Sequence, residues 1–566
     1  MHKKYISAIV VLIFSFLHAH SQISPYQYWQ QKKTETKKAA VVSAHPLASQ
    51  AGLLMIQQGG NAIDAAIATQ LALAVVYPGA GNIGGGGFMV AHLKNGKNIS
   101  IDYRETAPAK AFKDMYLDSA GNAVAELSQT GRLACGVPGT VAGLFASLKY
   151  AKLPFKKLIA PAIALAEKGF AITESQAQSF NHAKKEFEQV NKNAVAFVKQ
   201  RKWVAGDTLL QPELAATLKR IRDFGAKGFY EGKTADLIVK EMKRGNGIIS
   251  REDLKNYKAK EREVLQFKYK DVAVISMPLP SSGGIIIEQL MKMTGDRNIA
   301  GMGFETAASV QLMVEAERRA YADRANFLGD PDFIKVPVEK MLNDDYLRQR
   351  MSDFTPGKAG SSDITKAGLI HESEQTTHIS IVDGEGNAVS VTTTLNGGYG
   401  SKTVVSGAGF ILNNEMDDFS AKPGVPNMYG AVGNAANAIA PNKRMLSSMA
   451  PTIVLKNNKP YIVVGSPGGT TIPTSVYQTL MDILEFSLSP EEAVNKPKFH
   501  HQWLPDVVDV EKDFPQNVAE QLKAMGYKIN VRGAIGRTEL IVISPKGKRL
   551  VTAIADKRGD DDARGL

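Results

Sequence analysis

The sequence contains a single cysteine, Cys135, among its 566 residues. One cysteine cannot form a disulfide within the chain, so the stability of the protein has to come from packing. A zinc site built from several thiolates is excluded for the same reason. Lipid attachment to an N-terminal cysteine is excluded as well. We expect Cys135 to be a small buried apolar side chain.

Long apolar runs are also absent, except near the N-terminus. Ala8 to Leu17 is a ten-residue apolar stretch, preceded by two lysines and followed by the small residues of Ala19 to Ser21. Ten residues are too few to span a bilayer. The pattern predicts a signal peptide at residues 1–21, with an uncleaved membrane anchor as the alternative. We expect a periplasmic or secreted protein without stable membrane insertion after the signal is removed.

Acidic residues are outnumbered by basic ones. The chain has 68 Lys and Arg against 56 Asp and Glu, a charge of +12, which removal of Lys3 and Lys4 with the signal lowers to +10. The basic residues are dispersed, and no basic helix carries interleaved aromatic residues. This distribution argues against nucleic acid as a partner. An anionic substrate or an ordinary solvated surface accounts for the excess.

Several common catalytic signatures are missing. The sequence has no G-x-S-x-G, no H-E-x-x-H and no G-x-x-x-x-G-K-[ST] motif. The run from Gly84 to Gly87 lacks the lysine of a phosphate loop, and we interpret it as close backbone packing. His500 and His501 lack carboxylates at ligand spacing. We therefore expect neither a metal nor another cofactor.

Helical and strand-like patterns alternate along the chain. Charged helical segments such as Val314 to Asn326 are interpreted as exposed faces of packed helices. A linker rich in Gly, Ser, Lys, Glu and Gln separates Lys358 from Thr376. The order predicts a layered α+β fold whose sheets draw on both halves of the chain. The expected strand segments are 89–92, 99–103, 376–412 and 451–465, and the expected helices are 51–58, a stretch capped by Asn61, most of 138–347, and 472–486.

One β-hairpin is predicted together with its register. Residues 376–382 and 388–395 alternate, and a turn sequence from Asp383 to Asn387 lies between them. Reflection of the chain about Glu385 places Thr376 opposite Thr394. Cross-strand neighbours have Cβ atoms roughly 5 Å apart, which is close enough for hydroxyl contact.

A threonine hydroxyl is a weak nucleophile until a base removes its proton, and no histidine is spaced to serve Thr376. A threonine at a chain start can use its own α-amino group, which titrates near ~7.7–8.0. Such an arrangement requires cleavage of the chain directly before the threonine. The polar linker that runs into Thr376 is a place where a cut is tolerated.

Six segments in order along the chain together resemble the γ-glutamyltransferase family, and the resemblance extends from about Ala40 to the C-terminus. Any one of the six is a weak signal, but six in register are specific. They are the glycine run at 84–87, Asp102 to Pro108, Glu374 to His378, Asn413 to Phe419, Leu446 to Thr452, and Gly465 to Gly469.

The resemblance implies an N-terminal nucleophile hydrolase with a four-layer αββα sandwich. It implies autocatalytic cleavage between Gln375 and Thr376, which yields a heterodimer of a large subunit, residues 22–375, and a small catalytic subunit, residues 376–566. Both subunits then build one domain. By the same resemblance Thr376 is the nucleophile of cleavage and of catalysis, and Thr394 hydrogen-bonds it.

The implied reaction transfers a γ-glutamyl group from glutathione or another γ-glutamyl amide to water, an amino acid or a peptide, through an ester with Thr376. The α-carboxylate of that group suits a guanidinium and hydroxyl donors, and its α-ammonium suits carboxylates and an amide oxygen. Backbone N–H groups of Gly468 and Gly469, before a predicted helix, suit the oxyanion. The matching positions are Arg104, Ser447 and Ser448 for the carboxylate, and Glu415, Asp418 and Asn396 for the ammonium.

Pro423 to Gly430 resembles a loop that covers the site in bacterial members, with Tyr429 as its closing residue. Two alternatives stay open. One is an acylase of the same superfamily that acts on a cephalosporin-type or glutaryl acyl group, which the retained loop and the full charged set argue against. The other is a non-catalytic binding protein on the same fold, which the presence of Thr376 and the glycine pair argues against.

Overall fold

Two seven-stranded sheets form the centre of the molecule. The structure is a computed structural model that describes residues 23–362, 376–545 and 547–566. The predicted signal peptide and most of the linker before Thr376, including Gln375, lie outside the described residues. In spatial order, the first sheet contains β1 (Lys33–Thr36), β18 (Val551–Ile554), β17 (Glu539–Ile543), β13 (Lys459–Gly465), β12 (Thr452–Lys456), β9 (Val272–Ser276) and β8 (Leu265–Tyr269).

The second sheet contains the predicted hairpin at its centre. All pairings in both sheets are antiparallel. In spatial order its strands are β19 (Asp562–Gly565), β2 (Ala40–Ser43), β10 (Thr376–Val382), β11 (Ala388–Thr394), β3 (Gly86–His92), β4 (Asn98–Asp102) and β7 (Lys260–Arg262). Each sheet therefore contains strands from both halves of the chain.

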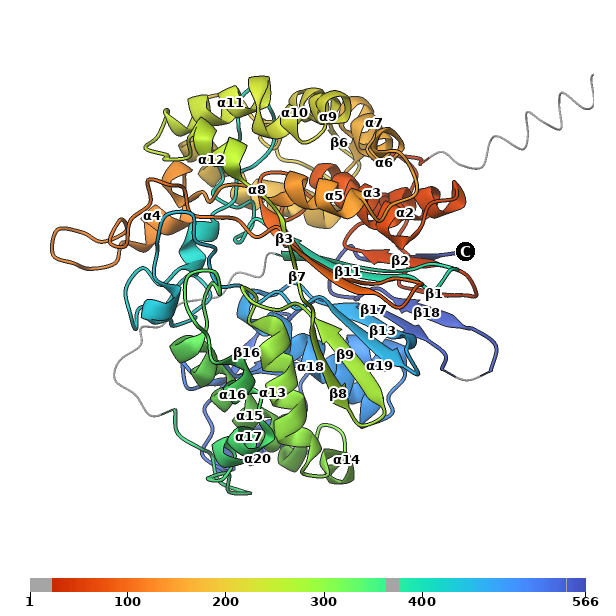
Figure 1. Cartoon of the computed structure of the whole chain (residues 1–566), viewed down its shortest axis with the longest axis vertical. Coiled ribbons are helices and arrows are strands. Elements are labelled where there is room, and N and C mark those ends of the chain that lie inside the picture. Colours follow the sequence, from red (N-terminus) through yellow and green to blue (C-terminus); the bar gives the residue numbers. More distant parts are fainter. Residues whose placement is uncertain (1–22, 363–375, 546) are drawn as a thin grey trace, which may run out of the picture.

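The two sheets stack face to face, and a layer of helices covers the outer face of each (Figure 1). This is the expected αββα sandwich. The layer over the second sheet contains α2 (Pro46–Gln57), α3 (Ala62–Val76), α5 (Thr140–Leu148), α6 (Phe155–Leu158), α7 (Ala160–Lys168), α8 (Glu174–Val190), α9 (Pro212–Phe224), α10 (Lys227–Tyr230), α11 (Gly232–Met242) and α12 (Arg251–Asn256). The layer over the first sheet contains α13 (Gly283–Gly295), α14 (Ile299–Met302), α15 (Ala307–Phe327), α16 (Val338–Met341), α17 (Asp344–Arg350), α18 (Ile472–Leu484), α19 (Pro490–Asn495) and α20 (Gln516–Ala524).

Shorter elements complete the fold. They are α4 (Ala125–Gln129), the 3₁₀ turns η1 (Arg132–Ala134), η2 (Glu415–Asp418), η3 (Ala435–Asn437) and η4 (Gly469–Thr471), the strands β14 (Phe499–His500), β15 (Val508–Glu511) and β16 (Ile529–Arg532), and the pair β5 (Phe170–Ala171) and β6 (Thr208–Leu209).

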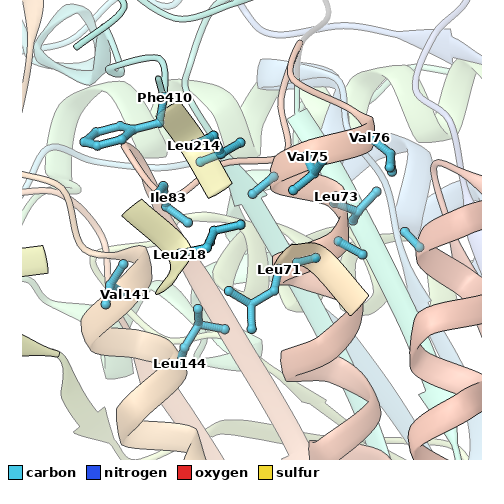
Figure 2. Packing of buried hydrophobic residues seen from close by; sticks show 14 of the residues in the cluster. Leu71, Leu73, Val75, Val76, Ile83, Val141, Leu144, Leu214, Leu218 and Phe410 are labelled. Carbon is cyan, nitrogen blue, oxygen red and sulfur yellow. The ribbon is translucent and has the colours of Figure 1, made fainter. Parts of the chain in front are cut away.

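Helix α3 is buried along its whole length, which explains why its sequence is apolar on every side. Figure 2 shows its side chains converging with those of α5 and α9, including Leu71, Val141 and Leu218. Asn61 caps the helix as expected: its side-chain oxygen accepts the amide hydrogens of residues 63 and 64, and the Asp64 carboxylate accepts that of Asn61.

The turn between β10 and β11 is fixed by one carboxylate. Asp383 accepts the backbone N–H groups of Glu385 and Asn387 within the turn. Its second oxygen accepts the N–H of Ala62, at the start of α3, at 2.9 Å. The hairpin is thereby attached to the most buried helix, and its register is determined at the turn.

Several expectations need correction. Helix α2 begins at Pro46 rather than at residue 51. Residues 395–412 form turns instead of continuing as a strand, and the mainly helical stretch 138–347 contains β7, β8 and β9. The charged face of α15 is not exposed: residues such as Glu315, Arg318 and Arg324 are buried, because other elements pack around this helix and pair with its charges.

Within the described ranges, none of the helices is long and apolar enough for a bilayer span. The glycine run behaves as expected from close packing: a Cβ on Gly85 would lie 2.1 Å from the carbonyl oxygen of Thr394, and one on Gly87 would lie 2.4 Å from that of Thr392. Strand β3 approaches β11 closely beside the hairpin end, and only glycine leaves room for it.

Candidate functional site

Thr376 and Thr394 lie directly opposite each other at the open end of the β10–β11 hairpin, so the predicted register is confirmed. Both side chains are buried. The hydroxyl oxygen of Thr394 accepts the amide hydrogen of Asn396 at 2.8 Å. Its single hydroxyl hydrogen is therefore directed elsewhere.

His378 follows on the same face of β10 but does not serve Thr376 as a base. Its Nδ1 contacts the hydroxyl of Thr392 at 2.9 Å and its Nε2 contacts that of Ser380 at 3.1 Å. Burial lowers the pKa of His378 to about 3, so the imidazole stays neutral. The observation fits the expectation that any base for Thr376 comes from elsewhere.

A small cavity next to Thr376 brings together most of the residues that the sequence singled out, drawn from both halves of the chain. Gly468 adjoins this lining without being part of it. The lining contains Arg104, Arg324, Thr376, Thr394, Asn396, Glu415, Asp418, Asn427, Tyr429, Ser447, Ser448, Met449, Gly469, Thr470 and Ile472.

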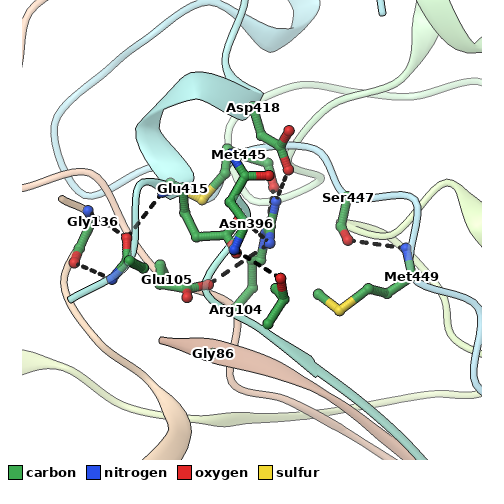
Figure 3. Close-up of polar contacts among 12 residues, drawn as sticks. Gly86, Arg104, Glu105, Gly136, Asn396, Glu415, Asp418, Met445, Ser447 and Met449 are labelled. Carbon is green, nitrogen blue, oxygen red and sulfur yellow. Dashed lines mark hydrogen bonds and ion pairs between the residues drawn. The ribbon is translucent and has the colours of Figure 1, made fainter. Parts of the chain in front are cut away.

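A charge cluster of Arg104, Glu105, Glu415 and Asp418 lies at one wall, where all but Glu105 line the cavity (Figure 3). Arg104 follows β4 directly, and both Glu415 and Asp418 belong to η2. The guanidinium of Arg104 lies 2.5 Å from the Glu415 carboxylate and also pairs with Asp418. Its Nε donates to the carbonyl of Met445 at 3.3 Å. Arg104 is thus paired with the carboxylates expected for an ammonium, because a buried guanidinium needs counter-charges.

Burial raises the pKa of both Glu415 and Asp418, and the neighbouring Arg104 opposes that rise. Burial also raises the pKa of Glu105 to about 8. Three carboxyl groups share the charge of one close guanidinium. A cationic group that enters the cavity meets acids that ionise more readily in its presence.

Ser447 and Ser448 form a second wall of the cavity, and both hydroxyl oxygens already accept hydrogen bonds. Ser447 Oγ accepts the amide hydrogen of Met449 at 3.1 Å (Figure 3). Ser448 Oγ accepts from Arg324 Nη2 at 3.1 Å. Each serine is left with its O–H group to donate, which suits an anionic ligand.

Asn396 presents an acceptor to the cavity. Its side-chain amide nitrogen donates to the carbonyl of Asn414 at 3.0 Å. The side-chain oxygen of Asn396 therefore stays available for a donor such as an ammonium. The backbone conformation here is left-handed, with φ of 75°, which asparagine tolerates better than most residues.

Gly469 lies under the ring of Tyr429. Its φ is 54°, and a Cβ at this position would lie 2.5 Å from the tyrosine ring, so glycine is required on both grounds. The Tyr429 hydroxyl donates to the carbonyl of Asn396 at 2.5 Å. Gly468 is the N-cap of η4, Gly469 is its first residue, and α18 follows. Among residues 23–362, 376–545 and 547–566, no backbone carbonyl accepts the amide hydrogens of these two glycines.

The loop that carries Tyr429 is closed over the cavity and is held by two acids. Asp417 accepts the amide hydrogen of Met428 at 2.9 Å, and Asp418 accepts from the Asn427 side chain at 3.0 Å. Burial raises the pKa of Asp417 to about 6. Tyr429 lines the cavity and packs on Gly469, and its role as a cover stays a prediction.

Two residues of the site escaped the sequence interpretation. Glu105 was visible only as the neighbour of Arg104 in the Asp102 to Pro108 segment. Arg324 was assigned to an exposed helix face, yet it is 9% exposed and lines the cavity. No local pattern in the sequence distinguishes this buried arginine from the charged residues of an ordinary exposed helix, because charged side chains on helices are mostly solvated.

The remaining candidate residues are two histidines and the cysteine, and their contacts are of a structural kind. Across the part of the chain that the structure describes, no group of three metal-ligating side chains occurs. His500 contacts Thr474 and Gln502, and His501 contacts Asp506. Cys135 is buried, and burial raises the pKa of its thiol to about 12, so it is not a reactive thiolate.

Comparisons with known proteins agree with this geometry. A family model described as gamma-glutamyltranspeptidase matches residues 48–566. The chain is 45% identical to the glutathione hydrolase proenzyme of Escherichia coli, over 93% of this chain and 91% of that one. The crystal structure of a cephalosporin acylase from Bacillus halodurans has a TM-score of 0.84 at 27% identity and covers 96% of this chain and 99% of that chain. A gamma-glutamyltranspeptidase from Helicobacter pylori has a TM-score of 0.55 at 42% identity and covers 60% of this chain and 94% of that chain.

Proposed function

The chain belongs to the γ-glutamyltranspeptidase family, and we propose that it transfers γ-glutamyl groups from glutathione or other γ-glutamyl amides to water, amino acids or peptides. The proposal rests on one observation: Thr376, Thr394 and the glutamyl-recognition residues line the same small cavity. No cofactor takes part in the proposed reaction.

Maturation is proposed as cleavage between Gln375 and Thr376, which separates a large subunit, residues 22–375, from a small subunit, residues 376–566. Two findings support this step. The E. coli relative is named a proenzyme. The chain in the H. pylori structure matches over 94% of its own length but only 60% of this chain, as a separate large subunit would. Strand β10 is hydrogen-bonded to β2, and β11 to β3. The two pieces therefore stay associated after the cut.

In the proposed reaction the Thr376 hydroxyl attacks the γ-carbonyl of the substrate. The new α-amino group of Thr376 takes the hydroxyl proton and passes it to the leaving amine as the amide C–N bond breaks. The product is an ester between the glutamyl γ-carbon and Thr376. Water or an amino group then attacks this ester and regenerates the hydroxyl. The N–H groups of Gly468 and Gly469 stabilise the oxyanion in both steps.

Recognition of the glutamyl group uses both walls of the cavity. Ser447, Ser448 and Arg104 bind the α-carboxylate, and Glu415, Asp418 and the Asn396 side-chain oxygen bind the α-ammonium. Because Arg104 is paired with both acids, the zwitterionic ligand exchanges one set of ion pairs for another and leaves the buried charge balanced. Tyr429 covers the bound group.

We also propose export of the protein, with residues 1–21 removed as a signal peptide and a periplasmic or secreted product. Intact-mass measurement of protein that has been exported with its own signal peptide tests the removal of residues 1–21 and the cleavage before Thr376 together. The expected result is two fragments, one of which begins at Thr376. A single uncut and fully active chain contradicts the proposed maturation.

The acylase alternative is separated by substrate. γ-Glutamyl-p-nitroanilide and glutaryl-p-nitroanilide differ only in the α-ammonium, so an enzyme with the proposed recognition hydrolyses the first at least about tenfold faster, since a hydrogen bond to a charged group contributes roughly 1.5–3 kcal/mol. Asp418→Asn should narrow the difference. Equal rates on both substrates, in the wild type and in Asp418→Asn alike, would refute the γ-glutamyl assignment.

A further inference from the structure

Arg324 is a buried guanidinium of the cavity to which the proposed reaction gives no part. It lies near the C-terminal end of α15 and contacts two hydroxyls, Ser448 Oγ through Nη2 and Ser282 Oγ through Nε, each at 3.1 Å. We propose that Arg324 is a positioning residue for binding of the α-carboxylate, acting through Ser448 and Ser447. This inference rests on the proposed function.

The first step of the argument is the polarity of the contact with Ser448. A guanidinium can only donate hydrogen bonds, so the Ser448 oxygen has to accept from Arg324. A hydroxyl has one hydrogen, and the hydrogen of Ser448 is consequently directed away from Arg324. Ser448 lines the cavity. The contact therefore prepares this serine as a donor to an anion.

The second step concerns Ser447, which Arg324 reaches through Ser282. The Ser282 hydroxyl accepts from Arg324 and donates to the carbonyl of Ser447 at 2.7 Å. The Ser282 amide donates to the same carbonyl at 2.8 Å. One guanidinium thus holds the side chain of one serine and, through an intermediate hydroxyl, the backbone of the other.

The third step is that α15 is itself attached to the opposite end of the cavity. One turn before Arg324, the Tyr321 hydroxyl donates to the carbonyl of Thr470, the residue that follows Gly469. Helix α15 therefore contacts both the wall formed by Ser447 and Ser448 and the oxyanion loop, which comprises Gly468, Gly469 and Thr470. Loss of the Arg324 contacts should loosen the serines while the oxyanion loop keeps its own attachment.

The charge of Arg324 acts in the same direction. It is a second cation near the carboxylate position besides Arg104, and it lines the same cavity as Asp418. The guanidinium of Arg324 helps Asp418 to remain ionised against the effect of burial. Binding of both charged groups of the ligand then depends on this arginine, although the arginine need not touch the ligand.

A double-mutant cycle with γ-glutamyl-p-nitroanilide tests the proposal. Arg324→Gln and Ser448→Ala should each raise KM about five- to tenfold and change kcat less than about threefold, because each removes one prepared hydrogen bond in binding. The double variant should lose little more than either single variant, since the two residues act as a unit. If the increase in KM of the double variant equals the product of the two single increases, the proposal is overturned.

Controls separate positioning from support of the fold. Arg319→Gln removes another buried guanidinium of α15 that pairs with Glu315 and Asp353, so it should lower stability without coupling to Ser448→Ala. Arg324→Lys keeps the charge and one donor, and should recover part of the lost affinity. If Arg324→Gln does not fold, the cycle is measured with Arg324→Lys and with Ser282→Ala, and independence of both from Ser448→Ala refutes the role.

The outcome also distinguishes this inference from the proposed function. Wild-type preference for the γ-glutamyl over the glutaryl anilide tests the function. An enzyme that shows this preference but has multiplicative losses in the cycle keeps the function and refutes the role of Arg324. An enzyme without the preference, yet with a coupled cycle, refutes the function and keeps the coupling between Arg324 and Ser448.

Discussion

The nucleophile hairpin and the charge cluster face the same cavity but are built in different ways. The hairpin is local: Asp383 determines the turn, and seven paired residues carry the register from Val382 to Thr376. The charge cluster is assembled from residues just after β4 and from η2, more than three hundred residues apart in the chain (Arg104 to Asp418, a separation of 314). Single substitutions outside the hairpin should therefore leave its register unchanged. The charge cluster, in contrast, should be disturbed by the loss of any one of its members.

The largest effect is expected from a substitution at the open end of the hairpin, where Thr376 lies. Thr376→Ala should leave one uncut chain and lower activity by more than about a thousandfold, since it removes the nucleophile itself. The neighbouring Thr377 occupies the other face of β10, and its buried hydroxyl has no hydrogen-bond partner among the described residues. Thr377→Ala is therefore the matched control and should be cut normally, as gel electrophoresis would show. Two subunits in Thr376→Ala would refute the cleavage site.

The next effect breaks the charge cluster. Arg104→Ala should lower kcat/KM for γ-glutamyl-p-nitroanilide by about one to two orders of magnitude, from the loss of a charged hydrogen bond. It should also destabilise the protein by about 3–5 kcal/mol, because Glu415 and Asp418 lose their buried counter-charge. Cleavage before Thr376 should survive, since the precursor holds no glutamyl ligand.

Arg262 offers the control for that loss of stability. It pairs with Asp102 at 2.7 Å and with Asp332, outside the cavity. Arg262→Ala should lower the melting temperature while KM stays within about twofold. If Arg262→Ala raised KM as much as Arg104→Ala, the effect at Arg104 would be attributed to the fold and not to recognition of the ligand.

A smaller effect sharpens the hairpin side. Thr394→Val keeps the shape of the side chain and removes the hydroxyl opposite Thr376, and should slow catalysis by about tenfold. Thr394→Ser should restore most of the rate. Thr393 donates to the Gly86 carbonyl and serves as the control on the same strand. Wild-type kinetics in Thr394→Val would show that the cross-strand pair has no part in the reaction.

The two regions also differ in how far the sequence predicted them. The spacing about Glu385 was sufficient for the pairing of Thr376 with Thr394, because hairpin register depends on neighbours in the chain. Arg104, Glu415 and Asp418 of the charge cluster were identified only through resemblance to a family, and Glu105 was not identified. The pairing of these side chains with each other was not foreseen, since it depends on tertiary burial.

Arg324 shows the limit most clearly. Its segment reads as an exposed amphipathic face, because charged side chains on a helix are solvated in most proteins. In this fold the face of α15 is covered, and its charges pair with other elements or reach the cavity. No local pattern carries that information. The strands β8 and β9 were missed within a mainly helical stretch for a related reason, since their place in the first sheet comes from pairing with distant β12.

The smallest expected effect concerns Glu105, whose carboxyl is fully buried, 3.8 Å from Arg104, and has a pKa raised by burial from 4.5 to about 8. Its folded pKa lies above its unfolded value, so between pH 4.5 and 8 the folded state keeps a proton that the unfolded state loses. The contribution to stability is complete below this window and is lost as the pH rises through it. Glu105→Gln keeps the shape without the titration, so the decrease in unfolding free energy from pH 5 to pH 8 should shrink by up to about 1.4 kcal/mol per pH unit of this window. Glu126→Gln, at an exposed position of α4, should leave that decrease unchanged. Denaturant unfolding at the two pH values measures both variants, and an unchanged decrease in Glu105→Gln would mean that the charge cluster holds Glu105 ionised at neutral pH.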